Sequence, residues 1–326
     1  MTIPQTPVTL NDVYEAQKTI SKYLPKTPLI HSLSLSEKLG CTAYVKLENT
    51  LPTGAFKIRG GINLLANLSA EEKSRGVIAA STGNHAQSVA YAAQLFGVKA
   101  VIGMPKNANP LKAEATRSFG ATVELHGKDY DEARAWVENE AQAKSYRYIH
   151  SANEPLLIAG VGTLYLEIMQ DLPDVDVIVV PIGGGSGAAS ACIVAKALNP
   201  NVKVIGVQAE NAPAVYQSWK TGKLAETASA DTFAEGLATR FTFEMTFDIL
   251  RKHLDDIVLI SETEIKRAIL TLLETNHQLA EGAGAASTAA AFKLREQLRG
   301  KKVALALTGG NLTMETLRGI LEELSV

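Results

Sequence analysis

The 326-residue sequence predicts an α/β fold with mainly parallel sheets. Short apolar runs of strand length alternate with longer helical stretches, and several of these runs are apolar at every position. Regular alternation of strands and helices is typical of a parallel sheet, and an uninterrupted apolar run indicates a strand covered on both faces. The expected strands are residues 44–47, 77–80, 99–104, 121–125, 175–180, 202–207, 257–260 and 303–307.

Helical patterns fill the intervals between these runs. A chain of this length is longer than one hydrophobic core usually serves, so we expect two domains or one large α/β unit. No low-complexity linker marks a boundary between them. The expected helices are residues 84–96, 130–144, 154–170, 187–198, 263–276 and 283–298.

The charge of the chain is nearly balanced, with 32 Lys and Arg residues against 34 Asp and Glu. This balance provides no basic surface for nucleic acid or for an anionic membrane, so neither is expected as a partner. Cys41 and Cys192 are the only cysteines, too few for a disulfide framework, and they favour a reducing compartment. No run approaches the roughly 18 apolar residues of a membrane span, and residues 1–24 lack the apolar core of a signal peptide. We therefore expect a cytoplasmic protein that acts on a small molecule.

The loop after the apolar run 175–180 is the most unusual turn of the chain. Ligands of open parallel sheets bind outside the carboxyl ends of the strands, so such turns are the places to search. Clustered glycines let backbone N–H groups converge on an anion, and the start of the next helix adds a partial positive charge. We therefore expect a phosphate site, with a serine hydroxyl as a further donor. The loop consists of Gly183, Gly184, Gly185, Ser186 and Gly187.

Two other interpretations of this loop stay open at this point. The letters from Gly183 to Ala188 also satisfy the Gly-x-Gly-x-x-Ala pattern of a dinucleotide site, which indicates an NAD-dependent oxidoreductase. The plainest alternative is a tight turn between a strand and a helix that binds nothing.

A second turn carries hydroxyl and amide side chains at the start of a helix. Residues 81–85, Ser-Thr-Gly-Asn-His, follow the expected strand 77–80. Such a turn suits a carboxylate. The alternative is a plain helix N-cap, with His85 on the surface.

The remaining two turns contain a lysine and a pair of glycines. Lys57 lies between Phe56 and Ile58, where partial loss of water would make its amine a nucleophile for carbonyl groups. Most lysines are merely solvated, which is the alternative. Residues 308–311, Thr-Gly-Gly-Asn, form either a second turn that faces a ligand or a helix N-cap at Asn311.

Together, in this order, these segments resemble the fold-type II pyridoxal-phosphate enzymes, specifically the branch of serine/threonine dehydratases (threonine ammonia-lyases) and serine racemases. The resemblance implies two open, mainly parallel-sheet domains of the tryptophan-synthase-β-like type. It implies a large cofactor-binding domain of residues 1–72 and 150–326, and a small mobile domain of residues 73–149. The matching segments are residues 46–49, 53–60, 81–87, 183–187, 234–236, 281–284 and 308–311.

The resemblance also implies pyridoxal 5'-phosphate as the cofactor. Lys57 would be its Schiff-base lysine and the general base that removes the Cα proton. Phe56 would pack against the pyridine ring, Asn84 would hydrogen-bond the ring hydroxyl, and Thr308 would face the pyridine nitrogen. A neutral hydroxyl at that position leaves the nitrogen largely unprotonated, which suits elimination.

The same resemblance assigns the phosphate and the substrate to particular turns. The loop from Gly183 to Gly187 would hold the phosphate. Glu281 would support the cofactor electrostatically, or else be a solvated glutamate before a helix. The substrate carboxylate would be held by the turn that contains Ser81, Thr82, Gly83 and His85.

The reaction implied is the conversion of a β-hydroxy amino acid, L-threonine or L-serine, to a 2-oxo acid and ammonia. The alternatives are a serine racemase and a dehydratase for 3-hydroxyaspartate or another 3-hydroxy amino acid. Thr82 stands where the racemase branch has a second serine, which favours dehydration. Gln208 and Ala214 replace the acidic residues of the metal-dependent members, so no metal is expected. Family habit favours a homodimer.

Overall fold

The computed structural model describes residues 8–325, which divide into two compact units. The first unit comprises residues 8–25 and 57–163, and the second comprises residues 26–56 and 164–325. The expected small domain, residues 73–149, falls inside the first unit, and its mobility stays a prediction. Residues 1–7 and 326 of the expected large domain lie outside the described residues.

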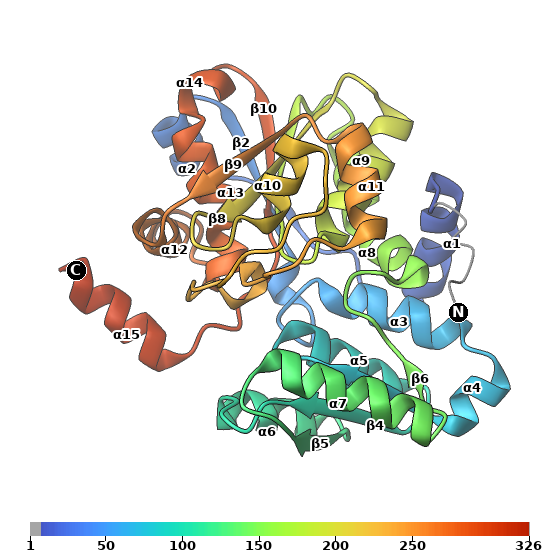
Figure 1. The fold of residues 1–326 in the computed structure, drawn as a ribbon. Coiled ribbons are helices and arrows are strands. Elements are labelled where there is room, and N and C mark those ends of the chain that lie inside the picture. The colour runs from blue at the N-terminus through green and yellow to red at the C-terminus, as the bar shows by residue number, and fades with distance from the viewer. Residues whose placement is uncertain (1–7, 326) are drawn as a thin grey trace. The chain divides into compact units, whose positions relative to one another are not determined.

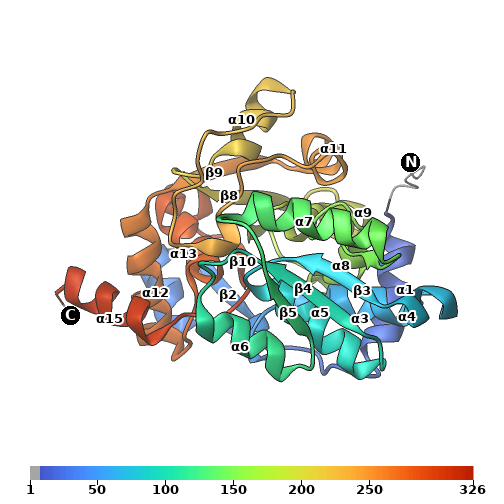
Figure 2. The same ribbon diagram turned by 60° about the horizontal axis from the view of Figure 1, so that its bottom comes forward.

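The first unit is built around a four-stranded parallel sheet in the order β5-β4-β3-β6. Its strands are β3 (Val77–Ala80), β4 (Ala100–Met104), β5 (Thr122–Leu125) and β6 (Arg147–Tyr148). Helix α7 (Tyr130–Ala143) covers one face of this sheet, whereas α5 (Asn84–Leu95) and α6 (Pro110–Ser118) cover the other (Figures 1 and 2). Apolar side chains of β3, β4 and α7 fill the core under α7.

The helix that begins at Lys57 is held in this unit by close packing against other helices. Helix α3 (Lys57–Asn67) packs against α5 and against α1 (Leu10–Ile20), and α4 (Ala70–Arg75) follows it. A Cβ on Gly61 would lie 2.4 Å from the Ser88 hydroxyl of α5, so α3 approaches α5 more closely than a side chain allows. Helix α8 (Pro155–Asp171) begins in the first unit and ends in the second.

The second unit contains a six-stranded sheet in the order β1-β2-β10-β7-β8-β9, parallel except for the edge strand β1. Central strands β10, β7 and β8 are buried along almost their whole length, as expected of a sheet covered on both faces. The strands are β1 (Leu29–His31), β2 (Thr42–Leu47), β7 (Val177–Pro181), β8 (Lys203–Ala209), β9 (Asp256–Ile260) and β10 (Lys302–Leu307).

Helices pack on both faces of this second sheet. Helix α9 packs on β7 and β8, and α11 packs against α9. Helix α13 packs on β10, β7, β8 and β9, and α12 packs against α13 (Figure 1). The helices of the unit are α2 (Leu33–Leu39), α9 (Ser186–Leu198), α10 (Ala214–Thr221), α11 (Glu244–His253), α12 (Glu262–Asn276), α13 (Gly282–Lys293), α14 (Arg295–Leu298) and α15 (Met314–Glu323), with short 3-10 turns η1 (Glu48–Thr50) and η2 (Glu235–Leu237).

The predicted fold class is confirmed, and each expected strand coincides with a strand of the structure. Strands β1 and β6 were not expected, because two or three residues are too short to show a pattern. The helix expected over residues 283–298 is interrupted at Leu294, where α13 ends and α14 begins. No helix among residues 8–325 is both long and apolar enough to cross a membrane.

Candidate active site

The glycine loop of the second unit connects β7 to helix α9, and Gly183 and Gly185 leave no room there for a side chain. A Cβ on Gly183 would lie 2.1 Å from the carbonyl oxygen of Gly236. Gly185, the N-cap of α9, has a φ of +92°, and a Cβ there would lie 2.8 Å from the Thr246 hydroxyl oxygen. Thr246 in turn donates a 2.9 Å hydrogen bond to the carbonyl of Gly184. The loop is therefore held tightly by η2 and α11.

This arrangement presents backbone N–H groups at the start of α9. The first amides of a helix have no intrahelical acceptor and carry a partial positive charge. The N-cap is a glycine that makes no side-chain cap bond, so no cap oxygen competes for these amides. The expected anion site is consistent with this backbone geometry.

Phe56 and the turn after β10 run side by side in the second unit. The Phe56 N–H donates a 2.9 Å bond to the carbonyl of Thr308, and Ala55 pairs with Gly309 in an antiparallel bridge. Asn311 donates a 2.9 Å bond from Nδ2 to the Thr53 carbonyl. Asn311 is therefore not a helix N-cap, and helix α15 begins later, with Thr313 as its cap.

The same turn brings Glu281 and the glycine loop toward Phe56. A Cβ on Gly309 would lie 2.5 Å from Oε1 of Glu281, so this carboxylate lies against the turn rather than in open solvent. A Cβ on Gly187 would lie 3.6 Å from Cε2 of the Phe56 ring. The second unit thus gathers Phe56, Thr308, Glu281 and the glycine loop.

Lys57 begins helix α3 in the first unit, directly after Phe56 in the chain. The side chain is partly exposed, and Nζ donates a 3.3 Å hydrogen bond to the Ser151 carbonyl. Removal of the ammonium group from water lowers the Lys57 pKa to about 8. Ser88 fixes the helix start through a 2.6 Å bond from Oγ to the Lys57 carbonyl. The partial desolvation expected of Lys57 is present in the structure.

Two histidines accompany Lys57: His85 is buried and His150 is half-buried. Burial lowers the pKa of His85 to about 3 and that of His150 to about 4, and the Lys57 charge adds to both shifts. Nε2 of His85 is 3.4 Å from the carbonyl oxygen of Ile149, which assigns the ring proton to Nε2. Nδ1 of His85 has no hydrogen-bond partner among the residues that the structure describes. His85 is thus a neutral, buried residue with an acceptor nitrogen available.

The turn before helix α5 is stabilised within itself. The Gly83 N–H donates a 3.2 Å bond to Oγ of Ser81, and Gly83 is the N-cap of the helix. Asn84 is the first residue of the helix. Neither Ser81 nor Thr82 is its N-cap, because the helix starts at Asn84 and Gly83 is its cap.

The structure therefore places the predicted residues in two groups that the peptide bond from Phe56 to Lys57 joins. The sequence interpretation missed His150, Ser151 and Ser88. His150 accepts bonds at Nδ1 from the N–H groups of residues 152 and 153, at 3.0 and 2.9 Å. For His150 and Ser151, the only signal in the sequence was the polar segment of residues 150–154.

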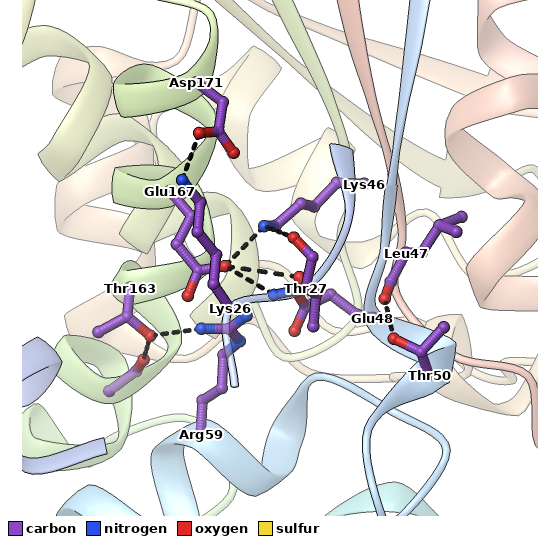
Figure 3. A network of polar contacts seen from close by, with 11 residues as sticks. Lys26, Thr27, Lys46, Leu47, Glu48, Thr50, Arg59, Thr163, Glu167 and Asp171 are labelled. Atoms are coloured by element: carbon purple, nitrogen blue, oxygen red, sulfur yellow. Dashed lines mark hydrogen bonds and ion pairs between the residues drawn. The ribbon is translucent and has the colours of Figure 1, made fainter. Parts of the chain in front are cut away.

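A buried polar network lies in the second unit, close along the chain to Phe56 (Figure 3). Lys46 forms a 2.6 Å ion pair with Glu167 and donates a 2.8 Å bond to the Thr27 carbonyl. The Thr27 hydroxyl donates a 2.6 Å bond to Glu48. Because Lys46 is fully buried, its charge depends on these partners. The network anchors β2 and η1, which precede Phe56.

Metal-binding groups are absent from the part of the chain that the structure describes: no three His, Cys, Asp or Glu side chains there are grouped to hold an ion. Gln208 is buried, with Oε1 accepting a 2.7 Å bond from the Tyr216 N–H and Nε2 donating a 3.4 Å bond to the Ile182 carbonyl. The expectation that the protein needs no metal stays a prediction.

Comparisons with known proteins match this arrangement. The model of a family described as pyridoxal-phosphate dependent enzyme matches residues 20–309. An L-threonine ammonia-lyase of Thermotoga maritima is 44% identical over 97% of this chain and 79% of its own length. Two solved structures are each 30% identical: threonine deaminase isoform 2 from Solanum lycopersicum (TM-score 0.91; 100% of this chain, 98% of that chain) and maize serine racemase (TM-score 0.92; 98% and 99%).

Proposed function

Because the chain belongs to the family of pyridoxal-phosphate-dependent enzymes, we propose that it is an ammonia-lyase that converts L-threonine to a 2-oxo acid and ammonia. The support for this reaction is that sequence relatives named L-threonine ammonia-lyase or dehydratase match over nearly the whole chain. The structural observation that carries the proposal is the desolvated amine of Lys57, directly after Phe56. The chain is similar to solved structures of both a threonine deaminase and a serine racemase, so the fold alone does not distinguish the two reactions.

The cofactor has three parts, and each has a counterpart in this chain. Its aldehyde requires an uncharged amine, and the lowered pKa of Lys57 provides one. Its aromatic ring requires an apolar face, which Phe56 offers beside the Thr308 turn. Its phosphate requires converging N–H groups, which the glycine loop offers where side chains are excluded. The residues present therefore fit pyridoxal 5'-phosphate.

We assign the individual contacts as follows. Lys57 would hold the cofactor covalently, Phe56 would pack on its ring and Thr308 would face the ring nitrogen. Asn84 would bond the ring hydroxyl, and Glu281, which lies against the Thr308 turn, would supply a negative charge nearby. The phosphate would be held by Gly183, Gly184, Gly185, Ser186 and Gly187. When bound, the cofactor supplies an electron sink that stabilises negative charge at the substrate Cα.

Lys57 is the group best suited to move the Cα proton. With a pKa of about 8, roughly a tenth of the lysine is uncharged at pH 7, against roughly one molecule in three thousand at the ordinary pKa of 10.5. An uncharged amine accepts a proton, so Lys57 acts as the general base. The nearby His85 and His150 are neutral at pH 7, so neither adds a positive charge beside the Lys57 amine.

The turn of Ser81, Thr82, Gly83 and His85 would bind the substrate carboxylate. The turn precedes helix α5, whose first amides favour an anion. His85 is fixed by the Ile149 carbonyl and presents Nδ1 as an acceptor for a donor group of the substrate. Thr82 stands where the racemase branch has a serine, and this difference favours elimination over racemisation.

Several finer features belong to the same proposal. L-serine is expected as a second substrate, because it carries the same β-hydroxyl leaving group. The cytoplasm is the proposed compartment, since both cysteines are buried free thiols. We also propose a homodimer, which light scattering of the purified protein would detect as twice the chain mass.

The reaction is tested with a panel of 3-hydroxy amino acids. Purified protein is incubated with each amino acid, and release of ammonia and of 2-oxo acid is followed. We expect equal amounts of both products from L-threonine, and loss of both with Lys57→Ala. Formation of D-serine from L-serine, with no 2-oxo acid from any member, would instead identify a racemase.

A further inference from the structure

The hydroxyl of Tyr165 is a buried polar group without a partner. Tyr165 lies in helix α8, its side chain is fully buried, and its Oη makes no hydrogen bond to any residue from 8 to 325. Most buried polar side-chain atoms are bonded to protein or to ordered water, and an isolated one calls for an explanation. An unsatisfied hydroxyl destabilises a fold, whereas a phenyl ring of the same shape would not.

This hydroxyl lies beside the first turn of helix α9. The position of a Cβ on Gly187 is 3.5 Å from Tyr165 Oη and 3.6 Å from Cε2 of Phe56. Gly187 is the second residue of α9, which directly follows the glycine loop. Since Gly187 has no side chain, nothing of that residue stands between the hydroxyl and the start of the helix.

The hydroxyl can only donate a hydrogen bond to an incoming anion. Burial raises the pKa of Tyr165 well above its ordinary value, and the nearby Glu48 carboxylate acts in the same direction. Tyr165 therefore keeps its proton at every physiological pH. The amides of the first turn of α9 are donors too, and they lack intrahelical acceptors. Donors from two helices thus lie beside Gly187, at the start of α9, where an anion would find them.

We propose that the Tyr165 hydroxyl donates a hydrogen bond to the phosphate group of pyridoxal 5'-phosphate, beside the amides of the glycine loop and helix α9. The inference rests on the proposed function, because it needs that cofactor. It explains why a tyrosine stands in an otherwise apolar stretch of α8, where Leu164 and Leu166 flank it. It adds a side-chain donor to a site otherwise built mainly from backbone.

The test compares wild-type protein with Tyr165→Phe, which removes one oxygen atom. Apoprotein is prepared from each by dialysis against hydroxylamine, and binding of pyridoxal 5'-phosphate is measured by absorbance titration. We expect the dissociation constant of the variant to be about tenfold larger, which corresponds to a loss of about 1.4 kcal/mol in binding free energy. Pyridoxal, which lacks the phosphate, should bind equally well to both proteins. Tyr216→Phe makes the same change on a partly exposed tyrosine of α10 and should alter neither constant.

The melting temperature of the apoprotein provides a second readout. Without the cofactor, Tyr165→Phe should melt no lower than wild type, because the change removes an unsatisfied buried group. A lower melting temperature would show that the hydroxyl is already bonded within the protein, and would contradict the inference. Equal affinity of both proteins for pyridoxal 5'-phosphate, or equal weakening for pyridoxal, would also contradict it. Wild type that binds no pyridoxal 5'-phosphate at all would overturn the proposed function itself.

Discussion

The two units of the chain carry different kinds of candidate site residues. In the second unit the proposed phosphate loop offers backbone groups: Gly183 approaches the Gly236 carbonyl so closely that no side chain fits. In the first unit the site is made of titratable side chains, Lys57, His85 and His150, whose pKa values are lowered by loss of water. A backbone site recognises shape and charge, whereas shifted side chains move protons. The second unit thus offers the proposed anion site, and the first unit offers the groups that can move protons.

This difference predicts opposite sensitivities. Adding an atom should damage the glycine loop of the second unit, and removing a functional group should damage the Lys57 region of the first.

Lys57→Ala should cause the largest loss. The change removes both the amine that would hold the cofactor and the proposed general base, so we expect kcat/KM for L-threonine to fall by about a thousandfold or more. The visible absorbance of the bound cofactor should disappear as well. Lys22→Ala, at an exposed lysine after helix α1, should leave both unchanged. Full activity in Lys57→Ala would end the assignment of chemistry to the first unit.

Breaking the Lys46–Glu167 ion pair tests whether side chains of the second unit serve stability rather than chemistry. Glu167→Gln removes the negative charge that pairs with the fully buried Lys46 amine, so we expect a loss of about 3–5 kcal/mol in the free energy of unfolding. Urea denaturation measures this loss.

A double variant supplies the control for that experiment. Lys46→Met with Glu167→Leu removes both charges and should recover most of the stability. Glu15→Gln breaks an exposed ion pair with Lys18 and should cost at most about 1 kcal/mol. If Glu167→Gln is as stable as Glu15→Gln, the network does not anchor this unit.

Gly183→Ala adds one carbon atom to the backbone site. Its Cβ would lie 2.1 Å from the Gly236 carbonyl oxygen, so the loop must move, at a cost of about 1–3 kcal/mol. We expect weaker binding of pyridoxal 5'-phosphate, measured by titration of the apoprotein. Gly319→Ala adds the same atom in helix α15, where nothing lies within 4 Å, and should leave binding unchanged. Equal affinity in both variants would contradict a backbone site at residue 183.

The acid stability of the protein should depend on His85 and His150. Their pKa values fall to about 3 and 4 in the folded protein, whereas the unfolded chain keeps the ordinary 6.5. Below pH 6.5 the unfolded state therefore binds more protons, and the free energy of unfolding should decrease as the pH falls from 6.5 to 4.

His85→Gln should flatten this pH dependence, because it removes one of the two groups. His253→Gln, at an exposed histidine of helix α11, should not change the slope. Thermal unfolding between pH 4 and 7 measures the slope, and parallel curves for the two variants would argue against a buried neutral His85.

How far the sequence predicts this site depends on the kind of residue. A glycine loop can be recognised in a sequence, because clustered glycines after an apolar strand are seldom needed for the fold alone and so indicate a ligand site. Desolvation is not visible: the burial of Lys57 and His85 depends on helices and loops that are distant in the chain. Tyr165 escaped notice because an aromatic residue among leucines is typical of a core helix, and only the structure shows its hydroxyl beside Gly187.

The same limit applies to the fold. Long, continuously apolar strands and strongly periodic helices were predicted to within a few residues. The first strand of the second sheet, β1, pairs antiparallel with β2 over three residues. Leu29 and Ile30 are apolar, but three residues are too few to show the pattern of a strand.

The most direct test of the central claim is to find which residue carries the cofactor. Wild-type protein loaded with pyridoxal 5'-phosphate is reduced with borohydride, digested and analysed by mass spectrometry. We expect a single modified peptide, with the phosphopyridoxyl group on Nζ of Lys57. Modification of a different lysine, or none at all, would contradict the assignment of Lys57 and with it the proposed mechanism.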